Sequence, residues 1–151
     1  SSYYREDLQG QLARLAKRLS VSVSFDNLVS DNGLVTAYNK ARITACPNLL
    51  EPFGLVPLES MACGTPVVGI AEGGLRETIQ HNETGLFTER DPREYGQAIS
   101  QLIMDKSLLE RMGERGRKLV LERWTWEKSY EQLEKNMRIA VERFNSSHYL
   151  Q

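Results

Sequence analysis

Hydrophobic and polar residues alternate along this chain with two different periods. Between positions 4 and 19, leucines recur every three or four residues, which predicts an amphipathic helix. Over positions 21–25, valines and a phenylalanine alternate with serines, which is typical of a short strand. Short apolar runs predict further strands at 42–46, 65–70 and 86–88, and the run at 65–70 is typical of a strand covered on both faces.

Helices are predicted between and after these strands, from apolar periodicity and from residues that suit helix ends. They cover about 32–40, 57–64, 75–80, 91–104, 107–123 and 126–143. Ser30 or Asp31 can cap the first of them. Pro57 takes the first position of its helix, which ends at Gly64, and Asp91 opens a later helix with a capping box.

Strands alternate with helices in the first part of the chain, and the remainder is helical. This order predicts an α/β fold, a Rossmann-like parallel sheet with right-handed crossovers and helices on both faces, followed by a helical C-terminal extension. No linker, repeat or low-complexity block interrupts the 151 residues. We therefore expect one domain over residues 1–144 and a frayed tail over 145–151.

Composition narrows the class of protein further. The apolar fraction of 40%, the charged fraction of 26% and a net charge of −1 are those of an ordinary soluble domain, and they do not favour binding to nucleic acid. No apolar run reaches the roughly 20 residues of a transmembrane segment. Cys46 and Cys63 lie in apolar surroundings, so we expect reduced cysteines and a cytoplasmic protein. No residues are spaced like a metal-ligand cluster.

One helix start lacks the usual cap. Ser, Thr, Asp or Asn normally satisfies the free amides there, but Gly54, Leu55 and Val56 precede Pro57, and none has a side-chain acceptor. An anion such as a diphosphate suits both the free amides and the helix dipole. Water or a neighbouring loop could satisfy the amides instead, so this feature alone does not indicate an anion site.

Two glutamates flank this helix start. Glu59 is expected near the helix mouth, where its carboxylate could accept hydrogen bonds from both hydroxyls of a ribose. It could instead reach back to the amide of Val56 as a capping-box residue. Glu51 lies at the carboxyl end of a predicted strand, where it could contact sugar hydroxyls, or could be an ordinary solvated loop residue.

Taken together, these residues resemble a known family. Glu51 and Glu59 have the E-x7-E spacing of the retaining GT-B glycosyltransferases of the glycosyl transferases group 1 family, which includes glycogen and sucrose synthases. Residues 58–68 read L-E-S-M-A-C-G-T-P-V-V and resemble the family's L-E-A-M-A-C-G-T-P-V-V run. Residues 73–77, 82–86 and 124–126 resemble its G-G-L-P-E loop, its G-x-T-G-L turn and the F-S-W that opens its last helix.

The resemblance implies roles for particular residues. Glu51 would be the catalytic residue that contacts the donor hexose near its anomeric carbon, and Glu59 would bind the ribose of the nucleotide. Val29 and Ser30 would lie near the nucleobase. The donor hydroxyls and the diphosphate would be held by the backbone amides of Phe53, Gly54, Leu55 and Val56.

The implied reaction belongs to carbohydrate biosynthesis. A hexosyl unit would pass from a UDP-, GDP- or ADP-sugar to an acceptor hydroxyl, with the anomeric configuration retained. The leaving phosphate would help to take the proton of the acceptor. The resemblance implies no metal and no other cofactor, because helix N-termini and basic side chains neutralise the diphosphate.

The family pattern also includes parts that this sequence does not show. Its donor-binding C-terminal half normally begins with a strand, a helix and a strand that precede the matching region, and its N-terminal domain binds the acceptor. We therefore expect the isolated chain to be inactive and to bind the donor weakly. The alternative is a non-catalytic GT-B-like module that binds nucleotide sugars or serves in assembly.

Overall fold

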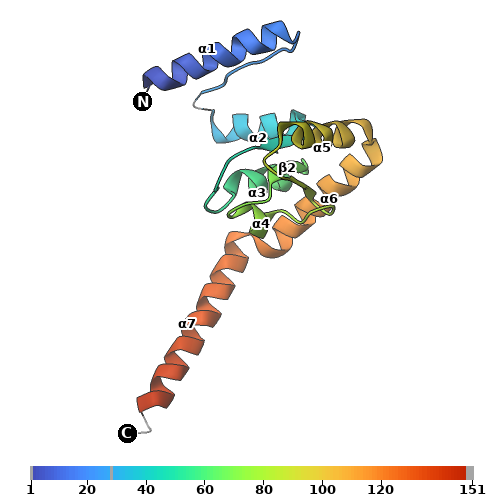
Figure 1. Ribbon diagram of the computed structural model, residues 1–151. Coiled ribbons are helices and arrows are strands. Elements are labelled where there is room, and N and C mark those ends of the chain that lie inside the picture. The colour runs from blue at the N-terminus through green and yellow to red at the C-terminus, as the bar shows by residue number, and fades with distance from the viewer. Residues whose placement is uncertain (1, 28, 149–151) are drawn as a thin grey trace. The chain divides into compact units, whose positions relative to one another are not determined.

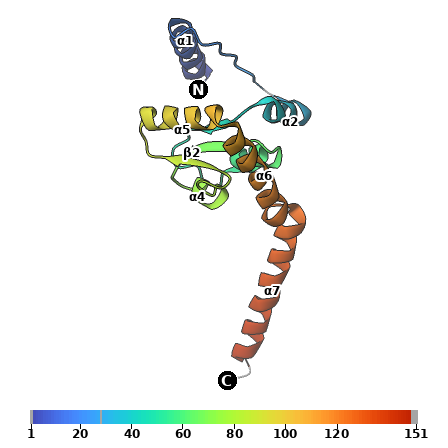
Figure 2. The same ribbon diagram turned by 90° about the vertical axis from the view of Figure 1, so that its right-hand side faces the viewer.

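The chain folds into two compact units, residues 1–34 and 35–151. The structure is a computed structural model, and it describes the backbone of residues 2–27 and 29–148 and the side chains of residues 8–27 and 29–146. Figures 1 and 2 show the elements from two directions. Each unit is described here by itself.

The first unit contains α1 (Ser2–Arg18) and the beginning of α2 (Asp31–Lys40). The helix predicted from the leucine spacing is confirmed. Ser30 caps α2, because its hydroxyl accepts a hydrogen bond from the amide of Gly33 at 3.2 Å. The leucines of α1 that the structure describes are largely exposed, with Leu8 at 56% and Leu12 at 43%.

The strand predicted over 21–25 is wrong. Within the described residues this segment has no strand conformation, and Val21, Val23 and Phe25 are exposed. The amide of Val21 instead donates to the carbonyl of Ala16 at the end of α1. A strand is held by hydrogen bonds to a neighbouring strand, and none of the strands in the described residues pairs with residues 21–25. The alternating pattern identified a segment whose side chains suit a sheet, but it carries no information about whether a neighbouring strand is present.

The second unit is built on a parallel sheet in the order β1-β2-β3. Its strands are β1 (Thr44–Cys46), β2 (Val67–Ile70) and β3 (Gly85–Thr88). In the register, Val68 lies opposite Ala45 on one side and Leu86 on the other. The strands predicted at 42–46, 65–70 and 86–88 are therefore confirmed, and all four residues of β2 are buried as expected for a strand covered on both faces.

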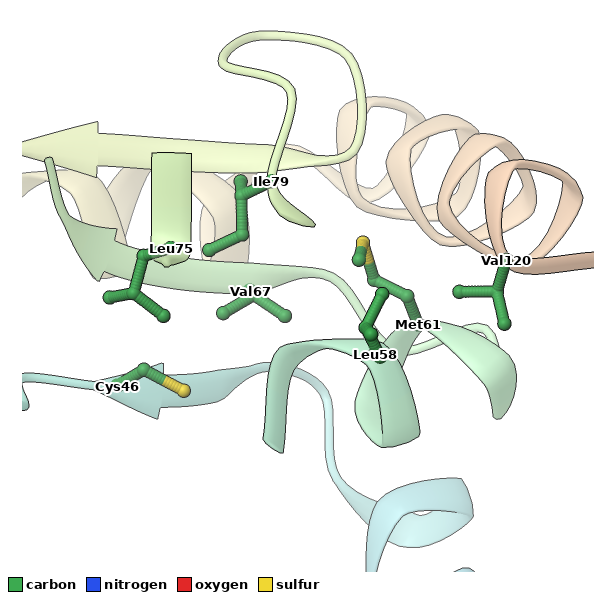
Figure 3. Close-up of a cluster of buried hydrophobic side chains, with 7 residues drawn as sticks. All are labelled: Cys46, Leu58, Met61, Val67, Leu75, Ile79 and Val120. Carbon is green, nitrogen blue, oxygen red and sulfur yellow. The ribbon is translucent and has the colours of Figure 1, made fainter. Parts of the chain in front are cut away.

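Helices cover both faces of this sheet, as Figures 1 and 2 show. The side chains of Val67 and Val68 point to opposite faces, because successive residues of a strand alternate. Val67 packs in a cluster with Leu58, Met61, Leu75, Ile79, Val120 and Cys46, from α3 (Leu55–Ala62), α4 (Leu75–Thr78) and the residue after it, α6 (Lys106–Arg123) and β1 (Figure 3). Val68 packs with Leu86, Ala98, Leu102 and Met112, from β3, α5 (Pro92–Met104) and α6.

Several helix boundaries differ from the prediction, and α3 and α4 each end two residues earlier than expected, at Ala62 and Thr78. The helix expected to begin at Pro57 begins at Leu55, so the proline is its third residue. Proline is tolerated there because the first four amides of a helix have no partner inside it. The last helix, α7 (Trp126–His148), continues five residues beyond the predicted end at 143 and includes part of the segment expected to fray. Residues 149–151 lie outside the described residues.

Candidate functional site

The loops that follow the three strands are joined at the carboxyl edge of the sheet. The amide of Gly74, after β2, donates to the carbonyl of Glu51, after β1, at 2.7 Å. Glu72 links all three loops, because it accepts a backbone hydrogen bond from Leu50 and forms an ion pair with Arg90, after β3. One of the two Arg90–Glu72 contacts joins Nη2 to Oε2 at 2.5 Å. In an open parallel sheet, this edge is where ligands bind.

The close approach of two loops requires glycine. A Cβ at Gly74 would lie 2.5 Å from the Cα and the carbonyl carbon of Phe53, which is too close for any side chain. Gly54 has a φ of 93°, in the left-handed region, and a Cβ there would lie 2.8 Å from the hydroxyl oxygen of Thr78. The E-P-F-G segment, residues 51–54, therefore lies directly against the backbone of the loop after β2. This contact determines the shape of the segment.

The start of α3 is open. Its N-cap residue is Gly54, and among the residues that the structure describes no side chain caps the helix. Leu55 and Val56 occupy the first two helical positions, where backbone amides have no partner inside the helix. The amide of Gly54 donates to Oε1 of Glu51 at 3.4 Å, so this amide already faces an acceptor. The helix thus lacks a side-chain cap as expected, but the amide of Gly54 is not free as the sequence suggested, because the side chain of Glu51 reaches back to it.

Glu51 is half-buried beside this helix start. Besides Gly54, its carboxylate accepts a hydrogen bond from Nδ2 of Asn48, also at 3.4 Å. Both bonds lie at the long end of the hydrogen-bond range, so the carboxylate is held loosely. Burial, together with the negative charge of Glu51, raises the pKa of the Cys46 thiol from its ordinary 9.0 to about 11. Cys46 is therefore a neutral thiol at physiological pH and no nucleophile.

Glu59 lies on α3 itself. Because the helix begins at Leu55, Glu59 is its fifth residue, two positions beyond the place of a capping-box glutamate. Its side chain is exposed, and its Oε2 accepts a hydrogen bond from the hydroxyl of Tyr38 at 3.1 Å. Tyr38 lies on α2, and burial together with this hydrogen bond raises the pKa of its phenol well above the usual range. The phenol is thus a permanent donor to Glu59.

Glu59 also lines an apolar cavity. It has a volume of about 350 Å³ and lies between α3 and the junction of α6 and α7. Phe53 and Trp124 meet edge to face at its rim, with ring centroids 5.7 Å apart. Trp126 also lines the cavity but is 89% exposed. Glu59 therefore takes part both in the hydrogen bond with Tyr38 and in the lining of this cavity.

The structure brings together six of the residues that the sequence singled out. Glu51, Phe53, Gly54, Leu55, Val56 and Glu59 belong to one loop and the helix that it opens. Val29 and Ser30 belong to the first unit, and their role as nucleobase contacts stays a prediction.

Sequence reasoning missed two residues, Asn48 and Tyr38. Asn48 lies three positions before Glu51, so a local side-chain contact could have been considered. Tyr38 lies 21 positions from Glu59, and no periodicity links the two. Only the tertiary structure brings Tyr38, in the part of α2 that belongs to the second unit, next to Glu59.

Throughout the described parts of the chain, no group of three or more His, Cys, Asp or Glu residues is arranged to hold a metal ion. No helix within residues 2–27 and 29–148 is both long enough and apolar enough to span a bilayer.

The loop and helix described above occur in a known family. Residues 6–119 match the family described as glycosyl transferases group 1. The chain belongs to this family. It is 37% identical over 128 residues to the D-inositol 3-phosphate glycosyltransferase of Corynebacterium jeikeium, a match that covers 83% of this chain and 30% of that protein. The chain spans between 21% and 36% of the length of the curated relatives that it matches.

Solved structures agree with this assignment. The sucrose-phosphate synthase of Thermosynechococcus elongatus has a TM-score of 0.79 and 30% identity, and the match covers 91% of this chain and 35% of that one. The C-terminal domain of a glycosyl transferase group 1 family protein from Francisella tularensis has a TM-score of 0.70 and 25% identity, and the match covers 80% of this chain and 64% of that one. The Rossmann-like fold expected from the sequence, that of the C-terminal half of GT-B proteins, is confirmed.

Proposed function

We propose that this chain is the donor-binding part of a retaining glycosyltransferase that uses a nucleotide diphosphate sugar. The observation that carries the proposal is the open start of α3, with the carboxylate of Glu51 at its N-cap and that of Glu59 further along the helix. Family membership supports the general class of activity. The local geometry supports the division of roles among the residues.

The diphosphate of the donor would bind at the start of α3. The amides of Leu55 and Val56 can donate to phosphate oxygens, and the positive end of the helix dipole favours the negative charge. Glycine at position 54 lets the phosphate approach the backbone, since no Cβ stands in the way. This arrangement neutralises charge through backbone dipoles, and we propose that no metal ion or other cofactor takes part.

Glu51 would accept hydrogen bonds from hydroxyls of the donor hexose and stabilise the positive charge that develops at the anomeric carbon. Its loose hydrogen bonds to Asn48 and Gly54 leave acceptor capacity for these hydroxyls. In the transfer step, the bond from the anomeric carbon to the diphosphate oxygen breaks. A bond to the acceptor oxygen forms on the same face, and the leaving phosphate takes the proton of the acceptor.

Glu59 would bind the ribose hydroxyls. It is exposed, and only one of its oxygens has a hydrogen bond within the described part of the chain. Other parts of the full-length protein would provide the remaining contacts to the diphosphate, and an N-terminal domain would bind the acceptor. We therefore propose that the 151-residue chain by itself binds the donor weakly and does not catalyse transfer.

Calorimetric titration with UDP, GDP and ADP tests the donor assignment. We expect one of the three to bind more tightly than its nucleoside monophosphate, because only the diphosphate reaches the start of α3. The variant Glu59→Gln should weaken this binding, whereas Glu83→Gln should not, because Glu83 is paired with Arg115 away from α3. The absence of binding by all three nucleotides at millimolar concentration would contradict the donor assignment.

Turnover of the full-length protein tests the catalytic role of Glu51. We expect Glu51→Gln to lower the transfer rate by about 100-fold or more, the range for removal of a group that stabilises transition-state charge, while the fold and nucleotide binding persist. Unchanged transfer in this variant would exclude the proposed role of Glu51. A wild-type protein that binds the nucleotide without transferring any sugar would favour the non-catalytic module.

A further inference from the structure

Tyr38 is joined to the core of the second unit at two points. Its hydroxyl donates to Oε2 of Glu59 at 3.1 Å, and its carbonyl accepts a hydrogen bond from the hydroxyl of Thr65 at 2.7 Å. Thr65 is 4% exposed and directly precedes the residues that lead into β2. The tyrosine is therefore fixed by its backbone to a buried residue, while its side chain reaches an exposed carboxylate.

The backbone of Glu59 is fixed as firmly. Its neighbour Ser60 is fully buried, and the Ser60 hydroxyl lies 2.7 Å from that of Thr44 and donates to the carbonyl of Thr65 at 2.9 Å. These contacts tie α3 to both β1 and the approach to β2. The side chain of Glu59 has several rotatable bonds and faces solvent, so its carboxylate would otherwise sample many positions. Tyr38 restricts it to one.

We propose that Tyr38 is a positioning residue that holds the carboxylate of Glu59 ready for the two hydroxyls of the donor ribose. The inference rests on the proposed role of Glu59 in ribose binding. A tyrosine hydroxyl suits this task, because it neutralises no charge and occupies one lone pair of a carboxylate that has about four acceptor sites. The remaining sites are left for the ribose, and their direction is set before the nucleotide arrives.

Such positioning has a measurable consequence. Fixing a flexible side chain before binding removes an entropic cost that would otherwise be paid on association. We expect Tyr38→Phe to weaken binding by about twofold to tenfold, the range for one immobilised side chain. The loss should appear only for ligands that carry ribose hydroxyls, because only these contact Glu59.

The test is calorimetric titration of the full-length protein with whichever of UDP, GDP and ADP binds best, and with its 2′,3′-dideoxy counterpart. Four proteins are compared: wild type, Tyr38→Phe, Glu59→Gln and the double variant. Tyr95→Phe is the matched control. Tyr95 lies on α5, away from Glu59, and its hydroxyl donates to the carbonyl of Val68 at 2.7 Å. This variant therefore loses the same chemical group outside the proposed site.

The expected result has three parts. Tyr38→Phe weakens binding of the ribonucleotide but not of the dideoxynucleotide, it has no further effect in the Glu59→Gln background, and Tyr95→Phe leaves both affinities unchanged. Equal weakening of both nucleotides by Tyr38→Phe, or an undiminished effect in the Glu59→Gln background, would mean that the tyrosine merely supports the fold. That result would overturn the inference.

Failure of the proposed function has a different signature. If Glu59→Gln and the removal of the ribose hydroxyls both leave the affinity of the wild-type protein unchanged, Glu59 does not bind the ribose, and the positioning role falls with it. If those two changes weaken binding and Tyr38→Phe does not, only the role of Tyr38 is wrong. Absence of binding for all three nucleotides would overturn both.

Discussion

The helices α3 and α5 both begin after a strand and a loop at the same edge of the sheet, yet their first turns are built in opposite ways. At α5, Asp91 has an extended backbone and its carboxylate accepts from the amides of Arg93 at 2.7 Å and Glu94 at 3.0 Å. At α3, Gly54 has left-handed φ and no side chain caps the helix in the described part of the chain. A side-chain cap is worth about 1 kcal/mol of stability.

The two helix starts differ in which groups satisfy their first amides. α5 uses one carboxylate to accept from two of its own amides. At α3 the carboxylate of Glu51 accepts from the amide of Gly54 at 3.4 Å, and within the described residues no side chain caps the amides of Leu55 and Val56, which we propose for the diphosphate. The start of α3 is held instead by contacts between loops.

The largest effect is expected from Gly74→Ala, which breaks the loop contact that shapes the start of α3. The new methyl group would lie 2.5 Å from backbone atoms of Phe53, and overpacking of this kind costs about 3 kcal/mol. We expect the midpoint of urea unfolding to fall and nucleotide binding to be lost. Gly96→Ala is the control in α5, where a Cβ meets nothing within 4 Å, and it should instead stabilise the protein by about 0.5–1 kcal/mol. Similar behaviour of the two variants would refute the assigned role of the loop contact.

The next largest effect is expected from Cys46, a buried residue of β1 that packs in the same cluster as Leu58 and Met61 of α3. Its pKa is raised from 9.0 to about 11, so its neutral thiol contributes stability that is complete below pH 9 and is lost as the pH rises towards 11. We expect the free energy of unfolding of the wild-type protein to fall across this window by about 2 kcal/mol more than that of Cys46→Ala. Thermal melting between pH 8 and about 11 measures the difference. Parallel curves for the two proteins would show that Cys46 does not titrate in this window.

A smaller effect is expected at the capped helix. Asp91→Ala removes the acceptor for two amides of α5 and should cost about 1 kcal/mol in the free energy of unfolding. Asp91→Asn should restore most of it, because asparagine caps helices about as well. Neither variant should change the affinity for the nucleotide. A loss of affinity equal to that of Glu59→Gln would show that the two helix starts do not have separate tasks.

The smallest effect is expected from the ion pair that joins the loops. Hydrogen bonds from Arg90 lower the pKa of Glu72 from 4.5, so the pair contributes stability above pH 4.5 that is lost as the pH falls through the folded-state pKa. Both side chains are partly exposed, and solvent screens their attraction. We expect Glu72→Gln to lower the melting temperature slightly at pH 7 and not at all in strong acid. A difference that persists in strong acid would point to packing and not to charge.

Much of the fold could be predicted from local pattern. The apolar run of β2 predicted a strand buried on both faces, and Asp91 with Pro92 predicted the start of α5. These signals work because hydrophobic period and helix capping act over a few neighbouring residues. The strand expected at 21–25 was wrong because a strand needs a partner, and its pattern carries no information about whether one exists.

The candidate site divides in the same way. The spacing of Glu51 and Glu59 and the lack of a side-chain acceptor before Pro57 could be seen in the sequence, since one loop and one helix contain them all. The early start of α3 at Leu55 could not, because it depends on the left-handed backbone of Gly54 resting against Thr78. Local sequence permits that conformation without requiring it.

The sequence by itself determined the order of the three strands of the sheet and of the helices around them, and the family motif, because each depends on side chains close together in the chain. The roles of Glu51, Glu59 and the amides between them in binding a nucleotide sugar stay a prediction. Only the tertiary structure decided how those residues are held. The contact of Gly74 with the E-P-F-G segment and the hydrogen bond from Tyr38 to Glu59 join segments that are distant in sequence. Such contacts form when helices and loops pack on a shared sheet, so they cannot be predicted from the hydrophobic periodicity of the chain.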